Sequence, residues 1–137
     1  MPPVWYLGVM PLQEPFDVGL DDAQRQQVAF NVLATKRPSG SFVQELIALL
    51  VAAGVGIEGK TIFGTASAVL PTGPGPILSV KPTGGTGPLG THNAGPAAYR
   101  RPGAQILVRA GTWAAADAMA QAAYDALVAV RNRQVVA

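Results

Sequence analysis

The sequence predicts an α+β fold, in which a mixed, largely antiparallel sheet carries two main helices packed on one face. Several short segments alternate apolar and polar residues with the period of two expected of half-buried strands. Two longer segments place apolar residues three and four positions apart, as amphipathic helices do. No apolar run approaches the length of a membrane span. Residues 1–137 are expected to form a single domain, since a chain of this length is usually one folding unit.

The first third of the chain predicts two strands that are antiparallel neighbours. Residues 4–12 form the first strand, with Trp5 and Val9 expected on one face and Tyr6 on the other. Residues 25–35 form the second strand, because apolar residues recur at every second position. The alternating apolar residues of the second strand are Val28, Phe30, Val32 and Ala34.

Two segments predict the helices, and each has recognisable end signals. Ser41 is expected to cap the N-terminus of a helix over residues 41–53, and Gly54 to end it. Thr112 is the expected N-cap of a longer helix over residues 113–131. The alanines of this second helix would allow it to approach the sheet closely. Its apolar residues at helical spacing are Ala116, Met119, Ala120, Ala123, Leu127 and Val130.

Further strands are predicted over residues 60–64, 77–81 and 104–110, with loops over 14–22 and 82–103. The second loop is rich in glycine and proline and has almost no periodicity. A loop this long in a compact domain is functional or disordered, so we expect it to be mobile in the free subunit and to act in assembly. The residues expected in this flexible assembly loop are Thr83, Gly84, Gly85, Thr86, Gly87 and His92.

The sequence shows no constellation of catalytic residues, and we expect a protein that is not an enzyme and uses no metal or cofactor. It has no cysteine, which excludes thiolate chemistry, and its one histidine, His92, lacks partners at ligand spacing. Asp21 and Asp22 are expected to be solvated or paired with Arg25. A net charge of +2 with 13% charged residues argues against a dedicated nucleic-acid binder. The low charge instead suggests a surface partly covered by other subunits.

A family resemblance starts in the segment QILVRAGTWAAADAMAQAAYDALVAVRN, residues 105–132. It resembles the tail-terminator (minor capsid) proteins of long-tailed bacteriophages, in which a strand of the type Q-x-x-V-R leads into a long helix ending near V-R-N. PILSVKPTGGTGPLGTHN, residues 76–93, is similar to the family's strand and glycine-rich loop. SFVQELIALLVAAG and KTIFG resemble its usual beginning, so that residues 41–134 match in the expected order.

The first forty residues resemble the end of such a protein rather than its beginning. They contain a strand, a turn of the type P-F-x-x-G-x-D-x-x-x-R, and a strand with F-N-V. Joining Ala137 to Pro2 would restore the family order. Our hypothesis is a circular permutant, engineered, in which 1–39 is the family's C-terminal segment, 41–137 its N-terminal and central part, and Gly40 a minimal linker. The alternative is a natural N-terminal arm.

The resemblance implies a homohexameric ring that caps the tail tube and joins it to the head connector. Its partners would be further copies of itself, the tail tube protein and the connector protein, with DNA passing through the channel unread. It would be found in the virion, and in the host cytoplasm during assembly. The alternatives are an engineered ring or tube scaffold without phage partners, and a small enzyme using Asp21 or Asp22 with His92. The residues expected at subunit contacts are Asp21, Asp22, Arg100, Arg101, Arg109 and Trp113.

Overall fold

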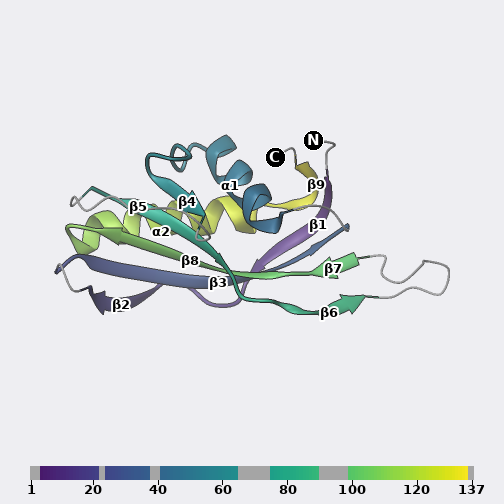
Figure 1. The fold of residues 1–137 in the computed structure, drawn as a ribbon, viewed down its shortest axis with the longest axis horizontal. Coiled ribbons are helices and arrows are strands. Elements are labelled where there is room, and N and C mark those ends of the chain that lie inside the picture. The colour runs from purple at the N-terminus through teal and green to yellow at the C-terminus, as the bar shows by residue number, and fades with distance from the viewer. Residues whose placement is uncertain (1–3, 22–23, 38–40, 65–74, 90–98, 136–137) are drawn as a thin grey trace.

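The protein consists of a mixed, mostly antiparallel sheet with two helices, which confirms the predicted α+β class (Figure 1). The computed structural model describes residues 4–21, 24–37, 41–64, 75–89 and 99–135. The strands are β1 (Val4–Pro11), β2 (Phe16–Leu20), β3 (Gln26–Lys36), β4 (Ile62–Gly64), β5 (Ile77–Pro82), β6 (Thr86–Leu89), β7 (Tyr99–Arg101), β8 (Gly103–Ala110) and β9 (Arg131–Val135). The helices are α1 (Phe42–Ala52) and α2 (Trp113–Val128).

The main path through the sheet runs β4–β5–β8–β3–β1–β9. The β4–β5 pair is parallel, and the other pairs are antiparallel. The long strand β3 organises the sheet, because β8 lies along one of its sides while β1 and β2 share the other. The predicted antiparallel pairing of the first two expected strands, β1 and β3, is therefore confirmed.

Both helices pack on the same face of the sheet, as predicted. α2 crosses β1, β3 and β8, while α1 lies over β4 and β5 and also contacts α2. The predicted alternation in β3 is confirmed, since its apolar residues at even positions are all buried beneath the helices. In α2 the buried residues are small, which lets the helix lie close to the sheet. The buried residues of α2 are Ala116, Ala120, Ala123 and Leu127.

The predicted starts of both helices and the predicted end of α1 are confirmed by hydrogen bonds. The Ser41 hydroxyl accepts a bond from the backbone N–H of Gln44 at 3.3 Å, and the Thr112 hydroxyl accepts one from Ala115 at 3.2 Å. At the other end of α1, Gly54 has a φ of +79°, which favours glycine, and its N–H bonds back into the last turn. These local signals fix where the helices begin and where α1 stops.

The predicted faces of β1 were wrong. Tyr6 and Val9 are both fully buried, whereas Trp5 is 38% exposed. The register against β3 shifts between Tyr6 and Gly8, so that an irregularity interrupts the simple alternation of faces. A pattern with a strict period of two therefore assigns Tyr6 to the wrong side.

Three predicted boundaries were also wrong. Residues 14–22 contain β2, and residues 82–103 contain β6 and β7 rather than an unbroken loop. The second helix ends at Val128 rather than at residue 131, and β9 follows it. β9 (RNRQV) has one apolar residue and therefore no period-two pattern, and backbone hydrogen bonds to β1 hold it. β2 (FDVGL) does alternate, but it is only five residues long and lies among Pro15, Gly19 and two aspartates, which are typical of a loop.

Candidate functional site

The face of the sheet opposite the helices carries apolar side chains of which several remain exposed. Phe16, Ala29 and Leu107 lie directly across from one another on β2, β3 and β8, and Met10 of β1 lies across from Leu33 of β3. Phe16 is 42% exposed and Met10 54% exposed. Ala29 is fully buried between them, and Leu33 and Leu107 are partly exposed. We call these five residues the open face. Exposed apolar groups that are neighbours in a sheet indicate a surface that another molecule covers.

The strand β2 borders this face and is exposed along most of its length. Within the described residues it pairs with β3 alone, so its other side offers backbone groups that no described strand occupies. An acidic residue of the preceding loop, Glu14, and the carboxylate of Asp17 accompany the apolar side chains of the strand. We call this surface the β2 edge; its residues are Glu14, Phe16, Asp17, Val18 and Leu20.

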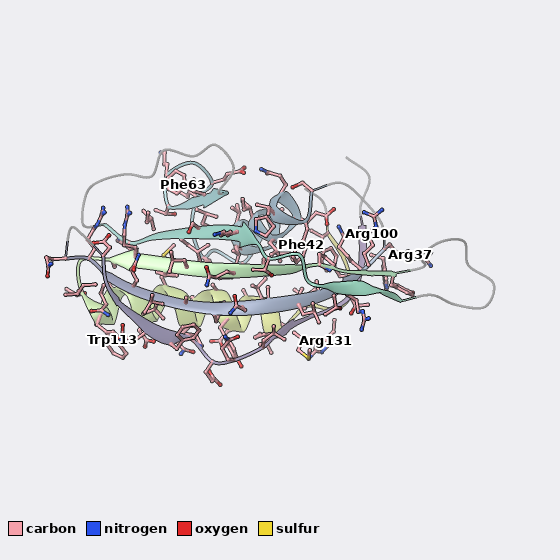
Figure 2. All side chains as sticks on the ribbon, turned by 60° about the horizontal axis from the view of Figure 1, so that its bottom comes forward. Arg37, Phe42, Phe63, Arg100, Trp113 and Arg131 are labelled. Atoms are coloured by element: carbon pink, nitrogen blue, oxygen red, sulfur yellow. The ribbon has the colours of Figure 1, made fainter. Side chains whose placement is uncertain are left out.

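A second surface lies where β6 and β7 extend past β1 and β9 (Figure 1). β7 pairs with β6 and, through Arg100, with Lys36 at the end of β3. The Arg37 guanidinium lies 5.5 Å from the centroid of the Tyr99 ring, within cation–π range. Arg37 and Arg100 are exposed and gather at this end of the molecule, far from Trp113 (Figure 2). We call Arg37, Tyr99, Arg100 and Arg101 the arm root.

Two of the residues predicted at subunit contacts are engaged within the chain. The Asp21 carboxylate lies 2.8 Å from the Arg25 Nε and 4.0 Å from the Arg109 Nε, at the turn between β2 and β3. Partial burial lowers the pKa of Arg109, and the nearby charge of Arg25 lowers it further, while Asp21 opposes both effects. The expected pairing of Asp21 with Arg25 is thus confirmed. Asp22 and His92 lie outside the described residues.

The other predicted contact residues fall on opposite ends of the molecule. Arg100 and Arg101 belong to β7, whereas Trp113 is the first residue of α2 and is 53% exposed. Figure 2 shows Trp113 at the end away from Arg100. The structure therefore does not bring the predicted contact residues together into one patch; it separates them into two surfaces.

The glycine-rich assembly loop is partly built into the sheet. The Thr83 N–H donates to the Gly103 carbonyl at 2.9 Å, and Thr86 pairs with Arg101. Gly85 has a φ of +70° and lies so close to the Arg101 carbonyl that a side chain there would collide with backbone. Glycine at this position serves a close backbone approach at the base of the arm. Thr83, Gly84 and Gly85 form the turn between β5 and β6, and Thr86 and Gly87 lie in β6.

Sequence reasoning missed a buried polar cluster under the start of α1. The Glu45 carboxylate accepts a hydrogen bond from the Tyr6 hydroxyl at 2.6 Å and lies 2.5 Å from the Lys36 Nζ. The side chains of Lys36 and Glu45 are each 2% exposed. The Lys36 Nζ also lies 5.9 Å from the centroid of the Phe42 ring. Burial raises the pKa of Tyr6 well above its usual range, and the hydrogen bond to Glu45 raises it further.

This cluster joins three elements, because Tyr6 comes from β1, Lys36 from β3 and Glu45 from α1. Its side chains are closed off from solvent, so its role is to fasten α1 to the sheet rather than to meet a substrate. A signal was present in the sequence. Lys36 continues the buried even positions of β3 that begin at Val28, and Glu45 directly precedes two buried apolar residues of α1.

The described part of the chain contains no group of three or more histidine, aspartate or glutamate residues arranged to hold a metal ion. Among the same residues, no helix is long and apolar enough to cross a membrane. Comparisons with protein-family models, with curated proteins and with solved structures gave no match.

Proposed function

We propose that this chain is a structural protein that assembles with copies of itself into a ring, as the phage tail terminators that it resembles do. The observation that carries the proposal is the apolar surface left uncovered on the open face and the β2 edge. The same chain buries a continuous core on the helix side, so this exposure is not a sign of a poorly formed fold. Exposed apolar surface beside a complete core is typical of proteins that bind other proteins.

The positions of two different surfaces on the chain support a head-to-tail contact between copies. The arm root and the β2 edge are chemically different and lie toward opposite ends of the molecule (Figures 1 and 2). A contact between two different surfaces is heterologous, and repeated contacts of this type close into a ring when the rotation per subunit divides the circle. The family resemblance sets the expected number at six subunits.

In the phage assembly that the resemblance implies, the ring would cap the tail tube and present a surface to the head connector. We assign the open face to the tube protein, because Phe16 and Met10 leave apolar side chains exposed there. DNA would pass through the channel without being read, which requires no recognition residues. The chain would act in the virion after assembly in the host cytoplasm.

The proposed permutation is compatible with how the sheet is built. Val4 of β1 and Val135 of β9 are direct partners in an antiparallel pair, so the first and last described residues lie side by side. In the family order, β9 would run into β1 as two adjacent antiparallel strands. A chain that starts at Ser41 and joins Ala137 to Pro2 should therefore fold to the same thermal stability and the same oligomeric mass. Failure of that rearranged chain to fold would argue against the permutation.

The ring is tested by measuring the mass of the purified protein with native mass spectrometry and mass photometry. The expected result is a discrete species of six subunits. Negative-stain electron microscopy of the same sample should show closed particles with a central hole. A chain that remains strictly monomeric at high micromolar concentration would contradict the ring, and open filaments would contradict its closure.

A further inference from the structure

We propose that the arm root of one copy binds the β2 edge of the next copy, so that the occupant of this edge is a second copy of the chain. The inference rests on the proposed ring and adds to it the two surfaces that make the subunit contact. Opposite charges on the two surfaces, exposed apolar side chains and the positions of the surfaces in the fold support this contact.

The arm root is basic, and two of its arginines, Arg37 and Arg100, carry exposed charges. Within the described residues neither arginine forms an ion pair. The Arg37 side chain is already held over the Tyr99 ring. Binding would therefore cost it less conformational entropy than it would cost an unrestrained arginine. A planar guanidinium can bind a carboxylate through two parallel hydrogen bonds, which favours an acidic partner surface.

The β2 edge is acidic and apolar together. Glu14 and Asp17 are exposed, and neither forms an ion pair within the described residues. One oxygen of the Asp17 carboxylate accepts bonds from the Gly19 N–H at 2.8 Å and from the Gln26 side chain, which fixes its orientation. Val18 is 49% exposed beside it. An oriented carboxylate next to apolar side chains suits a partner that brings arginine and tyrosine, residues that are enriched at protein interfaces.

The placement of the two surfaces prevents them from meeting within one chain. β6 and β7 extend at one end of the molecule, while β2 lies toward the end where α2 begins (Figure 1). Their charges can therefore be matched only between copies. Each copy would offer one arm root and one β2 edge, which is what a head-to-tail contact requires.

A charge-reversal experiment tests this contact. The edge variant carries Glu14→Lys with Asp17→Lys, and the arm variant carries Arg37→Glu with Arg100→Glu. Each variant alone places like charges at every contact and should associate at least about tenfold more weakly than the parent chain. An equimolar mixture should recover assembly, because alternation of the two variants restores an attraction at every contact. Native mass spectrometry would show alternating complexes of equal composition.

The matched controls are Glu58→Lys and Lys81→Glu, which reverse exposed charges outside both surfaces. These should assemble as the parent chain does. Circular dichroism and thermal melting establish that every variant is folded. If the edge and arm variants both assemble like the parent, the proposed contact is overturned.

Disulfide crosslinking tests the proposed contact and the proposed ring independently of each other. The chain has no cysteine, so Val18→Cys and Arg100→Cys can be placed in separate chains, mixed and oxidised. We expect a disulfide-linked pair of the two different chains, and a ladder ending at a closed ring when both cysteines are in one chain. Crosslinking within a species of two subunits would keep the contact and overturn the ring. A ring that assembles without crosslinking would overturn the contact and keep the ring, and a monomer without crosslinking would overturn both.

Discussion

The two faces of the sheet are built by alternate residues of the same strands, but the helices cover only one of them. In β3, Phe30 faces the helices and is completely buried, whereas Leu33 faces the other way and is partly exposed. The covered face even encloses an ion pair, while the open face leaves Met10 and Phe16 in solvent. The comparison shows that the helix-covered face holds the core, whereas the other face keeps apolar side chains exposed, which we propose a partner covers. Substitutions on the two faces should therefore have different consequences.

The largest effect is expected from breaking the buried ion pair. Glu45→Ala leaves the Lys36 ammonium buried without its carboxylate, which should lower the free energy of unfolding by about 3–5 kcal/mol. Equilibrium denaturation in urea measures the change. The control Glu58→Ala removes an exposed carboxylate and should stay within about 0.5 kcal/mol of the parent. A loss as small as that of the control would show that the pair contributes little.

The hydroxyl of Tyr6 should make stability depend on alkaline pH. Because the pKa of Tyr6 is raised in the folded chain, the unfolded chain loses this proton first, at about pH 10. The contribution is thus fully present below that pH and declines above it by up to about 1.4 kcal/mol per pH unit.

Denaturation curves at pH 8 and above, compared between the parent and Tyr6→Phe, isolate this contribution. Tyr6→Phe should be less stable at pH 8 by about 1.5–3 kcal/mol, because a hydrogen bond to a charged group is lost. The difference should shrink above about pH 10. A constant difference across this range would mean that Tyr6 titrates normally.

The close approach of α2 to the sheet should make its buried alanines intolerant of larger side chains. Ala120→Leu inserts three carbon atoms into a fully buried position and should destabilise the chain by about 1–3 kcal/mol. Ala122→Leu, on the exposed side of the same helix, should change stability by less than about 0.5 kcal/mol. Thermal melting of the pair measures the difference, and equal melting temperatures would contradict tight packing of α2.

The smallest effect on stability is expected at Met10 of the open face and at Leu12, which directly follows β1. Met10→Ser and Leu12→Ser replace side chains that are 54% and 56% exposed, so the free energy of unfolding should change by about 0.5 kcal/mol or less. Association should nevertheless weaken, and binding of a hydrophobic dye should fall, because apolar contact surface is removed. Sedimentation velocity and dye fluorescence provide the measurements. A large loss of stability would show that these side chains belong to the core instead.

Much of the fold followed from local patterns. Three helix ends could be predicted from Ser41, Thr112 and Gly54, because each end depends on hydrogen bonds between residues that are close in the chain. The alternation in β3 placed its buried face correctly, because a strand with one covered side must alternate. The stripe of α2 was equally informative. Such signals depend on residues within a few positions of one another, so the sequence contains them directly.

Other features depended on residues far apart in the chain. The irregularity in β1 against β3 decided that Tyr6 is buried, and no pattern within β1 announces it. β2 and β9 became strands because β3 and β1 offered them backbone partners. The contact residues expected from charge alone divided into an internal ion-pair cluster around Asp21 and a basic surface around Arg100. Charge in a sequence gives no information about which charges will meet.

The sequence by itself thus determined the helices, the central strands and the class of the fold, since hydrophobic periodicity and capping are local. The tertiary structure decided which charges are paired inside the chain and which are exposed at its surface. Lys36 and Glu45 are nine residues apart and meet only when the first turn of α1 packs against the end of β3. Arg37 is adjacent to Lys36 in the chain yet is exposed at the arm root, because neighbouring residues at the end of a strand point to different environments.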